Sequence, residues 1–154
     1  MKQLLFLAVF SIMQIPTFAA SPTVVTKQQK SCDLKVGDTY AGGIIFYIDS
    51  TSNCHGLVCA PYDQSKDANW ADAVTLSKSL GLGGYSDWRL PSMNELKQMY
   101  VKLLRHSLGN FANGYYWSSD ESRQYYAWDV NFATGIQYCS GKQSPGYVRV
   151  VRAF

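Results

Sequence analysis

Apolar and β-branched residues predict a hairpin at the start of the folded region. A run from Ile44 to Ile48 and a shorter run over residues 57–60 are separated by turn-forming residues at 49–53. Two short apolar runs joined by a polar turn are typical of paired strands. We therefore expect β structure over residues 36–60, followed by a polar loop that ends at Ala68.

The next segment repeats apolar residues with the period of an amphipathic helix. Asn69 is a favoured N-cap residue, and Gly81 stands where glycine often ends a helix. Between them, one helical face is formed by Trp70, Ala73, Val74, Ser77 and Leu80. This spacing predicts a helix over residues 70–80.

A second helix follows the charged and aromatic cluster Asp87-Trp88-Arg89. Pro91 disfavours helical geometry in the residue before it, and Ser92 and Glu95 have the spacing of a capping box. The apolar face of the helix is then formed by Met93, Leu96, Tyr100 and Leu103. The cluster therefore lies at a strand-to-helix junction, where we predict structural roles for Trp88, Arg89, Ser92 and Glu95.

Strands return in the last third of the chain, over residues 115–119, 126–132, 136–139 and 147–154. Trp117 and Trp128 lie in these strands, and we expect both to belong to the same framework as Trp88. Strands, two consecutive helices and more strands predict an α+β domain, with the two helices packed on antiparallel sheets.

The first residues have the layout of a secretory signal peptide. Lys2 precedes an apolar run over residues 4–10, and small residues suited to cleavage stand near Ala20. The apolar run is short for a membrane span and is followed by Gln14 and Pro16. We expect export to the periplasm, the cell surface or the medium, with a signal peptide over 1–20, a linker over 21–34 and one domain over 35–154.

Charge and composition exclude some classes of function. The chain carries a formal charge of +3, which falls to +2 once Lys2 is removed with the signal peptide. This charge is too small to indicate nucleic-acid binding, and we expect no membrane span after cleavage. Aromatic residues make up 14% of the chain, with 11 tyrosines, which suits both a compact core and a glycan-binding surface.

Four cysteines remain after cleavage, and an oxidising compartment predicts two disulfides. Of the three pairings, we prefer Cys32 with Cys139 and Cys54 with Cys59. The alternative is a metal site formed by Cys54, His55, Cys59 and His106, but this spacing matches no zinc pattern.

The candidate catalytic groups form no recognisable pattern. The spacing of Asp87, Asp120, Glu121 and Asp129 selects no acid–base pair, and their other reading is a turn, a cap or an ion pair with Arg89. Ser118, Ser119 and His106 match no nucleophile motif. We expect no catalytic residue and no cofactor, and a hydrolase or oxidase using surface carboxylates or cysteines is kept as an alternative.

Two further sets of residues are candidates for binding. Asp129 and Asn131 lie two apart on a strand, so both would offer oxygens to Ca²⁺ from one face, but they are too few for a site. Basic side chains suited to carboxylate or sulfate are Lys97, Lys102, Arg105, Arg123 and Lys142. Their other reading is ordinary solvated charge.

The order of short motifs along the chain resembles the DUF1566 family, the C-terminal domain of Legionella collagen-like adhesins. The resemblance covers about residues 35–154, and its main motifs are Gly42–Tyr47, Ala60–Ser65, Gly84–Ser92, Tyr116–Ser119 and Val148–Phe154. It implies a C-type-lectin-like fold, related to that of the formylglycine-generating enzyme. It also implies a surface module that binds sulfated glycosaminoglycans and assembles as trimers.

The residues and the resemblance together predict an exported, non-enzymatic binding module for an acidic glycan or another surface polyanion. The resemblance implies a homotrimer, but the collagen-like stalk of those adhesins is absent from this sequence, so trimerisation is not carried over from the family. The Glu-Pro-Asn motif of calcium-dependent lectins is missing from the sequence, so calcium-mediated sugar binding is not implied. The alternative within the binding class is a structural or partner-binding envelope protein.

Overall fold

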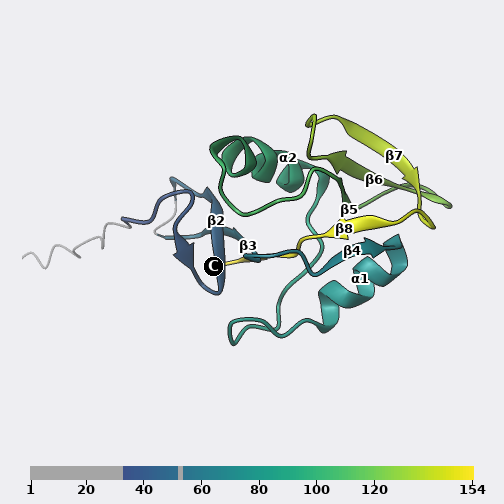
Figure 1. The fold of residues 1–154 in the computed structure, drawn as a ribbon. Coiled ribbons are helices and arrows are strands. Elements are labelled where there is room, and N and C mark those ends of the chain that lie inside the picture. The colour runs from purple at the N-terminus through teal and green to yellow at the C-terminus, as the bar shows by residue number, and fades with distance from the viewer. Residues whose placement is uncertain (1–32, 52–53) are drawn as a thin grey trace, which may run out of the picture.

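Two β-sheets and two α-helices make up the described part of the chain in this computed structural model, residues 33–51 and 54–154 (Figure 1). The expected signal peptide lies outside the described residues, as do most of the expected linker and Cys32. One sheet has the strand order β1-β2-β3-β9, formed by Thr39–Tyr40, Gly43–Ile48, Gly56–Cys59 and Val151–Ala153. The other has the order β4-β8-β5-β6-β7, formed by Ser65–Ala68, Gly146–Val148, Tyr115–Arg123, Tyr126–Asn131 and Gln137–Gly141.

The four-stranded sheet confirms the hairpin that the apolar runs predict. Strands β2 and β3 pair antiparallel, with Ile44 opposite Cys59, and β9 adds to the other edge of β3. Ile45 and Val58 face one another across the hairpin and are fully buried. The C-terminal strand β9 therefore forms one edge of this sheet.

The five-stranded sheet differs from the prediction at one edge. Ser65–Ala68 was expected to be loop, but it forms β4 and pairs with β8. Three of its four residues are polar, and Lys66 and Asp67 are exposed, so the segment carries no hydrophobic alternation to reveal it. The sheet is also mixed, because β8 runs parallel to β5.

The C-terminal run is two strands rather than one. Residues 146–148 belong to the five-stranded sheet and residues 151–153 to the four-stranded sheet. Arg149 and Val150 lie between them, and both are fully buried. The sequence predicted one strand because residues 147–154 form a continuous run rich in valine, although the adjacent pair Val150-Val151 interrupts strict alternation at the change of sheet.

Both helices begin where their caps predict. Helix α1 spans Trp70–Ser79, and the Asn69 side chain accepts a hydrogen bond from the backbone of Asp72. Helix α2 spans Met93–Lys102, and both hydrogen bonds of its capping box are present; a 3₁₀ turn, η1, follows at Leu104–His106. Helix α1 ends differently from the prediction, because Leu80 turns to extended geometry and Gly81 does not adopt a left-handed conformation.

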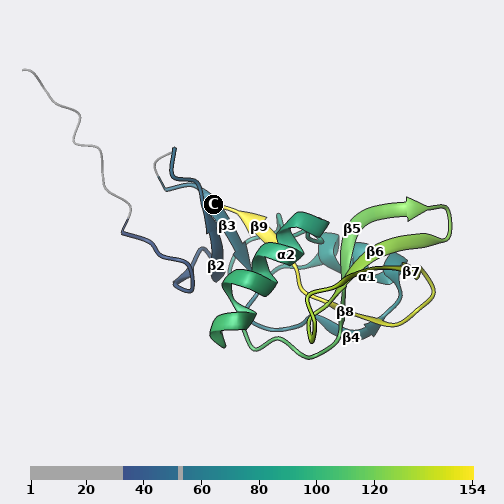
Figure 2. The same ribbon diagram turned by 90° about the horizontal axis from the view of Figure 1, so that it is seen from above.

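The helices cover opposite faces of the five-stranded sheet (Figures 1 and 2). Tyr116 and Trp117 are neighbours on β5 and point to opposite faces. Tyr116 packs in a cluster with Leu96 of α2, whereas Trp117 packs in a second cluster with Ala73 of α1. Within the described ranges, neither helix is long and apolar enough to cross a membrane.

Candidate functional site

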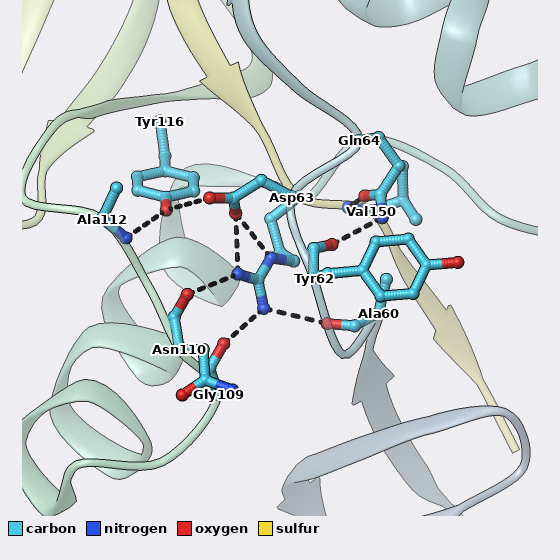
Figure 3. A network of polar contacts seen from close by, with 10 residues as sticks. Ala60, Tyr62, Asp63, Gln64, Gly109, Asn110, Ala112, Tyr116 and Val150 are labelled. Atoms are coloured by element: carbon cyan, nitrogen blue, oxygen red, sulfur yellow. Dashed lines mark hydrogen bonds and ion pairs between the residues drawn. The ribbon is translucent and has the colours of Figure 1, made fainter.

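Arg149, in the junction between the two sheets, is the centre of a buried polar network (Figure 3). Its guanidinium contacts Asp63 at 2.7–2.8 Å and donates to the carbonyls of Ala60 at 3.0 Å and Gly109 at 2.7 Å. It also lies 4.1 Å from the ring centre of Phe111. Arg149 thus connects the loop after β3 and the loop after η1 to the C-terminal segment.

Tyr116 extends this network toward α2. Its hydroxyl donates to Asp63 at 3.0 Å and accepts from the backbone of Ala112 at 2.8 Å. Burial and the nearby Asp63 carboxylate raise the pKa of Tyr116 well above its ordinary value, so the phenol stays neutral. With every polar atom of the phenol and carboxylate engaged, this network serves structure.

The cluster Asp87-Trp88-Arg89 sends its three side chains to three different partners. Asp87 forms two hydrogen bonds to Arg152 of β9, at 2.7 and 3.1 Å, and not to Arg89. Hydrogen bonding to Arg152 lowers the pKa of Asp87. The Trp88 side chain is buried and donates to the carbonyl of Leu82.

Arg89 extends the capping box of α2. Its two terminal nitrogens bind the two carboxylate oxygens of Glu95, at 2.7 and 2.6 Å. Burial favours a higher pKa for Glu95, but hydrogen bonds from Arg89 and Ser92 outweigh it, so the pKa is lowered. A second carboxylate, Asp120, accepts from the first backbone N–H of the helix. The junction cluster thus connects β9, the core and the start of α2.

The tryptophans divide between core and surface. Trp117 is buried, and its indole N–H donates to the carbonyl of Ala68; the backbone of Gly146 packs so closely on this indole that a Cβ there would lie 2.6 Å from Nε1. Trp128 is half-buried and belongs to neither core cluster. The fourth tryptophan, Trp70, is also half-buried.

Among the other candidate side chains, contacts within the fold are made by Ser118, Glu121 and His55. The Ser118 hydroxyl is buried and donates to the carbonyl of Trp128, and Glu121 pairs with Lys142. His106 is exposed on η1, and His55 contacts the carbonyl of Phe154. Among the described residues, no three His, Cys, Asp or Glu side chains group as a metal site would require.

Asp129 and Asn131 do not form a joint oxygen site. Asn131 accepts from the backbone of Ala133 in the turn after β6. Asp129 is only 2% exposed, and its Oδ1 has no hydrogen-bond partner in the described part of the chain. Burial raises the pKa of Asp129 to about 6, although a hydrogen bond with Ser140 opposes the rise. The two weak calcium candidates are thus an amide that hydrogen-bonds within a turn and a buried carboxylate whose charged form is disfavoured by burial.

The cysteines differ from both expected pairs. Cys59 and Cys139 have free thiols, so Cys32 is not bonded to Cys139 and Cys54 is not bonded to Cys59. Cys54 is disulfide-bonded. Cys59 stands on β3 with its side chain buried in the α2 cluster, whereas Cys139 is exposed on the edge strand β7. The predicted pairs were wrong because disulfide partners are determined by their positions in the fold and not by their spacing along the chain.

The two free thiols are expected to react very differently with iodoacetamide. Burial raises the pKa of Cys59 to about 12, despite the nearby charge of Arg149, so this thiol is protonated and shielded at neutral pH. Cys139 is expected to be alkylated in the folded protein, and Cys59 only after unfolding. Peptide mass mapping locates the label, and rapid alkylation of Cys59 in the native state would contradict the buried position.

The predicted basic residues fall into two groups. Lys97, Lys102 and Arg105 are exposed along α2 and η1, and none forms an ion pair with a described residue. Arg123 is the last residue of β5 and is exposed. The β5–β6 hairpin extends away from α2 (Figures 1 and 2). Lys142 lies near the tip of this hairpin, where it binds Glu121 and the carbonyl of Gln124. The five residues therefore do not share one surface.

A cleft of about 310 Å³ lies between α1 and the segment that leads to α2. One wall is the stripe Trp70, Val74, Ser77 and Lys78 of α1; the other includes Arg89 and Ser119. The sequence assigned Trp70 to the buried face of its helix and did not reveal the cleft. The one sign of the cleft in the sequence was the position of this tryptophan, which lies in the first turn of the helix next to the polar cap.

The fold and its charge clusters define an α+β domain whose carboxylates, arginines and tryptophans mainly serve structure. A model of the Lcl C-terminal domain family matches residues 47–152, and the chain belongs to this family. At family level it is an adhesin-like, extracellular module, and the family is not a known enzyme family. Comparison with curated proteins gives no match. The α+β class is confirmed, while the C-type-lectin-like assignment stays a prediction.

Proposed function

We propose that this chain is an exported, non-catalytic adhesin module that binds an acidic glycan or another surface polyanion through α2 and η1. The observation that carries the proposal is the exposed, unpaired state of Lys97, Lys102 and Arg105 among the described residues. The four basic side chains that hold the fold together are all paired, namely Arg89, Lys142, Arg149 and Arg152. Charge left unpaired on one element is available to a ligand.

The arrangement along the helix suits an extended ligand. Lys97, Val101 and Arg105 follow one another at intervals of four residues, and Val101 is 47% exposed between the two cations. Glu95, the acid of α2, is neutralised by Arg89. The surface therefore presents two cations with the apolar side chain of Val101 between them. This arrangement suits an acidic polysaccharide, which offers anionic groups and apolar ring faces in turn. Basic residues near the end of α2 also complement the helix dipole.

Charge reversal on this surface is expected to abolish retention on heparin. We expect the folded protein to bind heparin at about 0.15 M salt and the double variant Lys97→Glu/Arg105→Glu to elute without retention, because surface ion pairs with a polyanion are strongly screened. The matched control is Lys35→Glu/Lys66→Glu, which changes the net charge equally at exposed positions outside α2. Its retention should be nearly unchanged.

Two results would contradict the proposal. Absence of retention even at about 0.02 M salt would remove the polyanion as ligand. Equal losses in both double variants would show that overall charge, rather than the α2 surface, governs binding.

Exposed tyrosines favour partner binding as the second candidate function. Tyr115 and Tyr138 form an edge-to-face pair on the five-stranded sheet, with ring centres 5.4 Å apart, and Tyr125 at the hairpin tip is 69% exposed. Tyrosine is enriched in protein interfaces. A photoreactive residue at Tyr125 would then crosslink one partner in an envelope extract, and the same group at Lys66 would not; equal labelling from both would oppose this function.

A further inference from the structure

We propose that the cleft between α1 and the Arg89–Ser92 segment holds a single sugar ring that carries one anionic group, carboxylate or sulfate. The proposal rests on the proposed function for its ligand class, because a glycan is assumed, but it concerns a different surface. Helix α1 and helix α2 lie on opposite faces of the five-stranded sheet (Figures 1 and 2). The cleft is thus a second binding site.

The size of the cleft suits one ring. Its volume of about 310 Å³ lies at the lower end of the range for small-ligand sites, about 300–1,000 Å³. Positions 70, 74, 77 and 78 lie on one stripe of α1, so the wall they form is continuous. A polymer would have to enter through one terminal or side-branch residue.

Trp70 gives the cleft a fixed aromatic wall. Its indole N–H donates to the carbonyl of Ser118 at 2.8 Å, and the Lys142 ammonium lies 4.5 Å from its ring centre. These two contacts, one at the edge and one at a face, set the orientation of the ring before any ligand binds. A half-buried indole held in this way, next to Val74, offers an apolar surface to the C–H face of a sugar.

Polar groups of the cleft are arranged for hydroxyls. The Ser119 hydroxyl has no partner among the described residues, because only the backbone N–H of Ser119 is engaged, with Pro91. Ser77, on the facing wall, is only 1% exposed, and its hydroxyl donates to the carbonyl of Val74. The serine hydroxyl that the lining leaves available to a ligand is therefore that of Ser119.

The charge of the cleft matches one anion. The Arg89 guanidinium is balanced by Glu95, which uses both terminal nitrogens and leaves Nε without a partner in the described chain. Lys78 is exposed and has no ion pair there. The uncompensated charge on the lining is that of Lys78, and Arg89 adds a directed donor. One anionic substituent, rather than a multiply charged group, fits this balance.

The test uses the indole N–H signal of Trp70, followed by NMR in the purified chain with its disulfide intact. Methyl β-glucuronide and glucose 6-sulfate supply the two anions, and methyl β-glucoside is the neutral control. We expect at least one anionic sugar to shift the Trp70 signal at roughly millimolar concentration and the neutral glucoside not to shift it. Lys78→Glu should raise the dissociation constant derived from the Trp70 shift about tenfold or more, while Lys66→Glu should leave this constant unchanged.

Three results would overturn the cleft as an acidic-sugar site: no shift by either anion, equal shifts by neutral and anionic sugars, or full binding by Lys78→Glu. Heparin retention, measured on the same samples, separates the two proposals. Retention that depends on α2 without any Trp70 shift removes the cleft and keeps the proposed function. A Trp70 shift without heparin retention removes the α2 surface and keeps the cleft.

Discussion

Replacing Arg149 with Met is expected to lower the free energy of unfolding by about 3–5 kcal/mol, the largest loss of any single change considered for this domain. The guanidinium is fully buried and pairs with Asp63 while donating to three backbone carbonyls. Methionine fills similar space but leaves these carbonyls without the guanidinium donor, and it leaves the Asp63 carboxylate with no cation and only the Tyr116 hydroxyl as a donor. Breaking one side of a buried pair is far more destabilising than the pair is stabilising.

Equilibrium urea unfolding, followed by tryptophan fluorescence, measures the change. The first control is Arg89→Met, whose ion pair with Glu95 is partly exposed and whose loss should cost about 1 kcal/mol or less. The second is Arg149→Met/Asp63→Asn, which removes the uncompensated charge and should recover part of the loss. A loss below about 1 kcal/mol for Arg149→Met alone would show that the network does not hold the two sheets together.

The motifs behind the family resemblance acquire a physical meaning from these contacts. Arg149 and Arg152 belong to the C-terminal motif, Asp63 to the Ala60–Ser65 motif and Asp87 to the Gly84–Ser92 motif. In the structure each arginine pairs with the acid of an earlier motif, 86 and 65 residues away. The motifs therefore meet in space, where they join loops to the strand that ends the chain.

Local features could be predicted from the sequence, and long-range features could not. Both helix caps were predicted correctly because the residues that form them lie within three positions of one another. The partner of Asp87 was missed because Arg152 is distant in the chain and Arg89 is near. Strand β4 and the junction at Arg149 were missed because pairing with β8, rather than the residues' own pattern, determines them.

The candidate sites follow the same division. The exposed cations of α2 could be read from helical spacing alone, and the structure adds that they are unpaired among the described residues. The cleft could not be predicted, because its walls come from α1, the Arg89–Leu90 segment and β5. Trp70 was predicted to be a core residue because the spacing of apolar residues shows which face of a helix is apolar. The spacing does not show whether a neighbouring element covers that face.

Asp129→Asn is expected to stabilise the protein at neutral pH by up to about 2–3 kcal/mol and to remove a pH dependence of stability. The ordinary pKa of an aspartate is 3.8, and burial raises that of Asp129 to about 6. The folded protein therefore binds a proton here more tightly than the unfolded chain does. Stability associated with this group is full below pH 4 and is lost as the pH rises through about 6. At pH 7 the buried carboxylate is charged, and its Oδ1 lacks a partner among the described residues.

Urea unfolding of the wild type and Asp129→Asn, measured at intervals from pH 4 to pH 8, isolates this contribution as the difference between the two curves. Asp87→Asn is the matched control of opposite sign, because Arg152 lowers the pKa of Asp87 and its contribution is lost only as the pH falls below the ordinary aspartate value. The Asp129 difference should be small near pH 4, grow between pH 4 and pH 6, and level off above. A difference that does not vary with pH would show that the carboxylate is not destabilised by burial, and the orphaned oxygen in the sheet would then need another explanation.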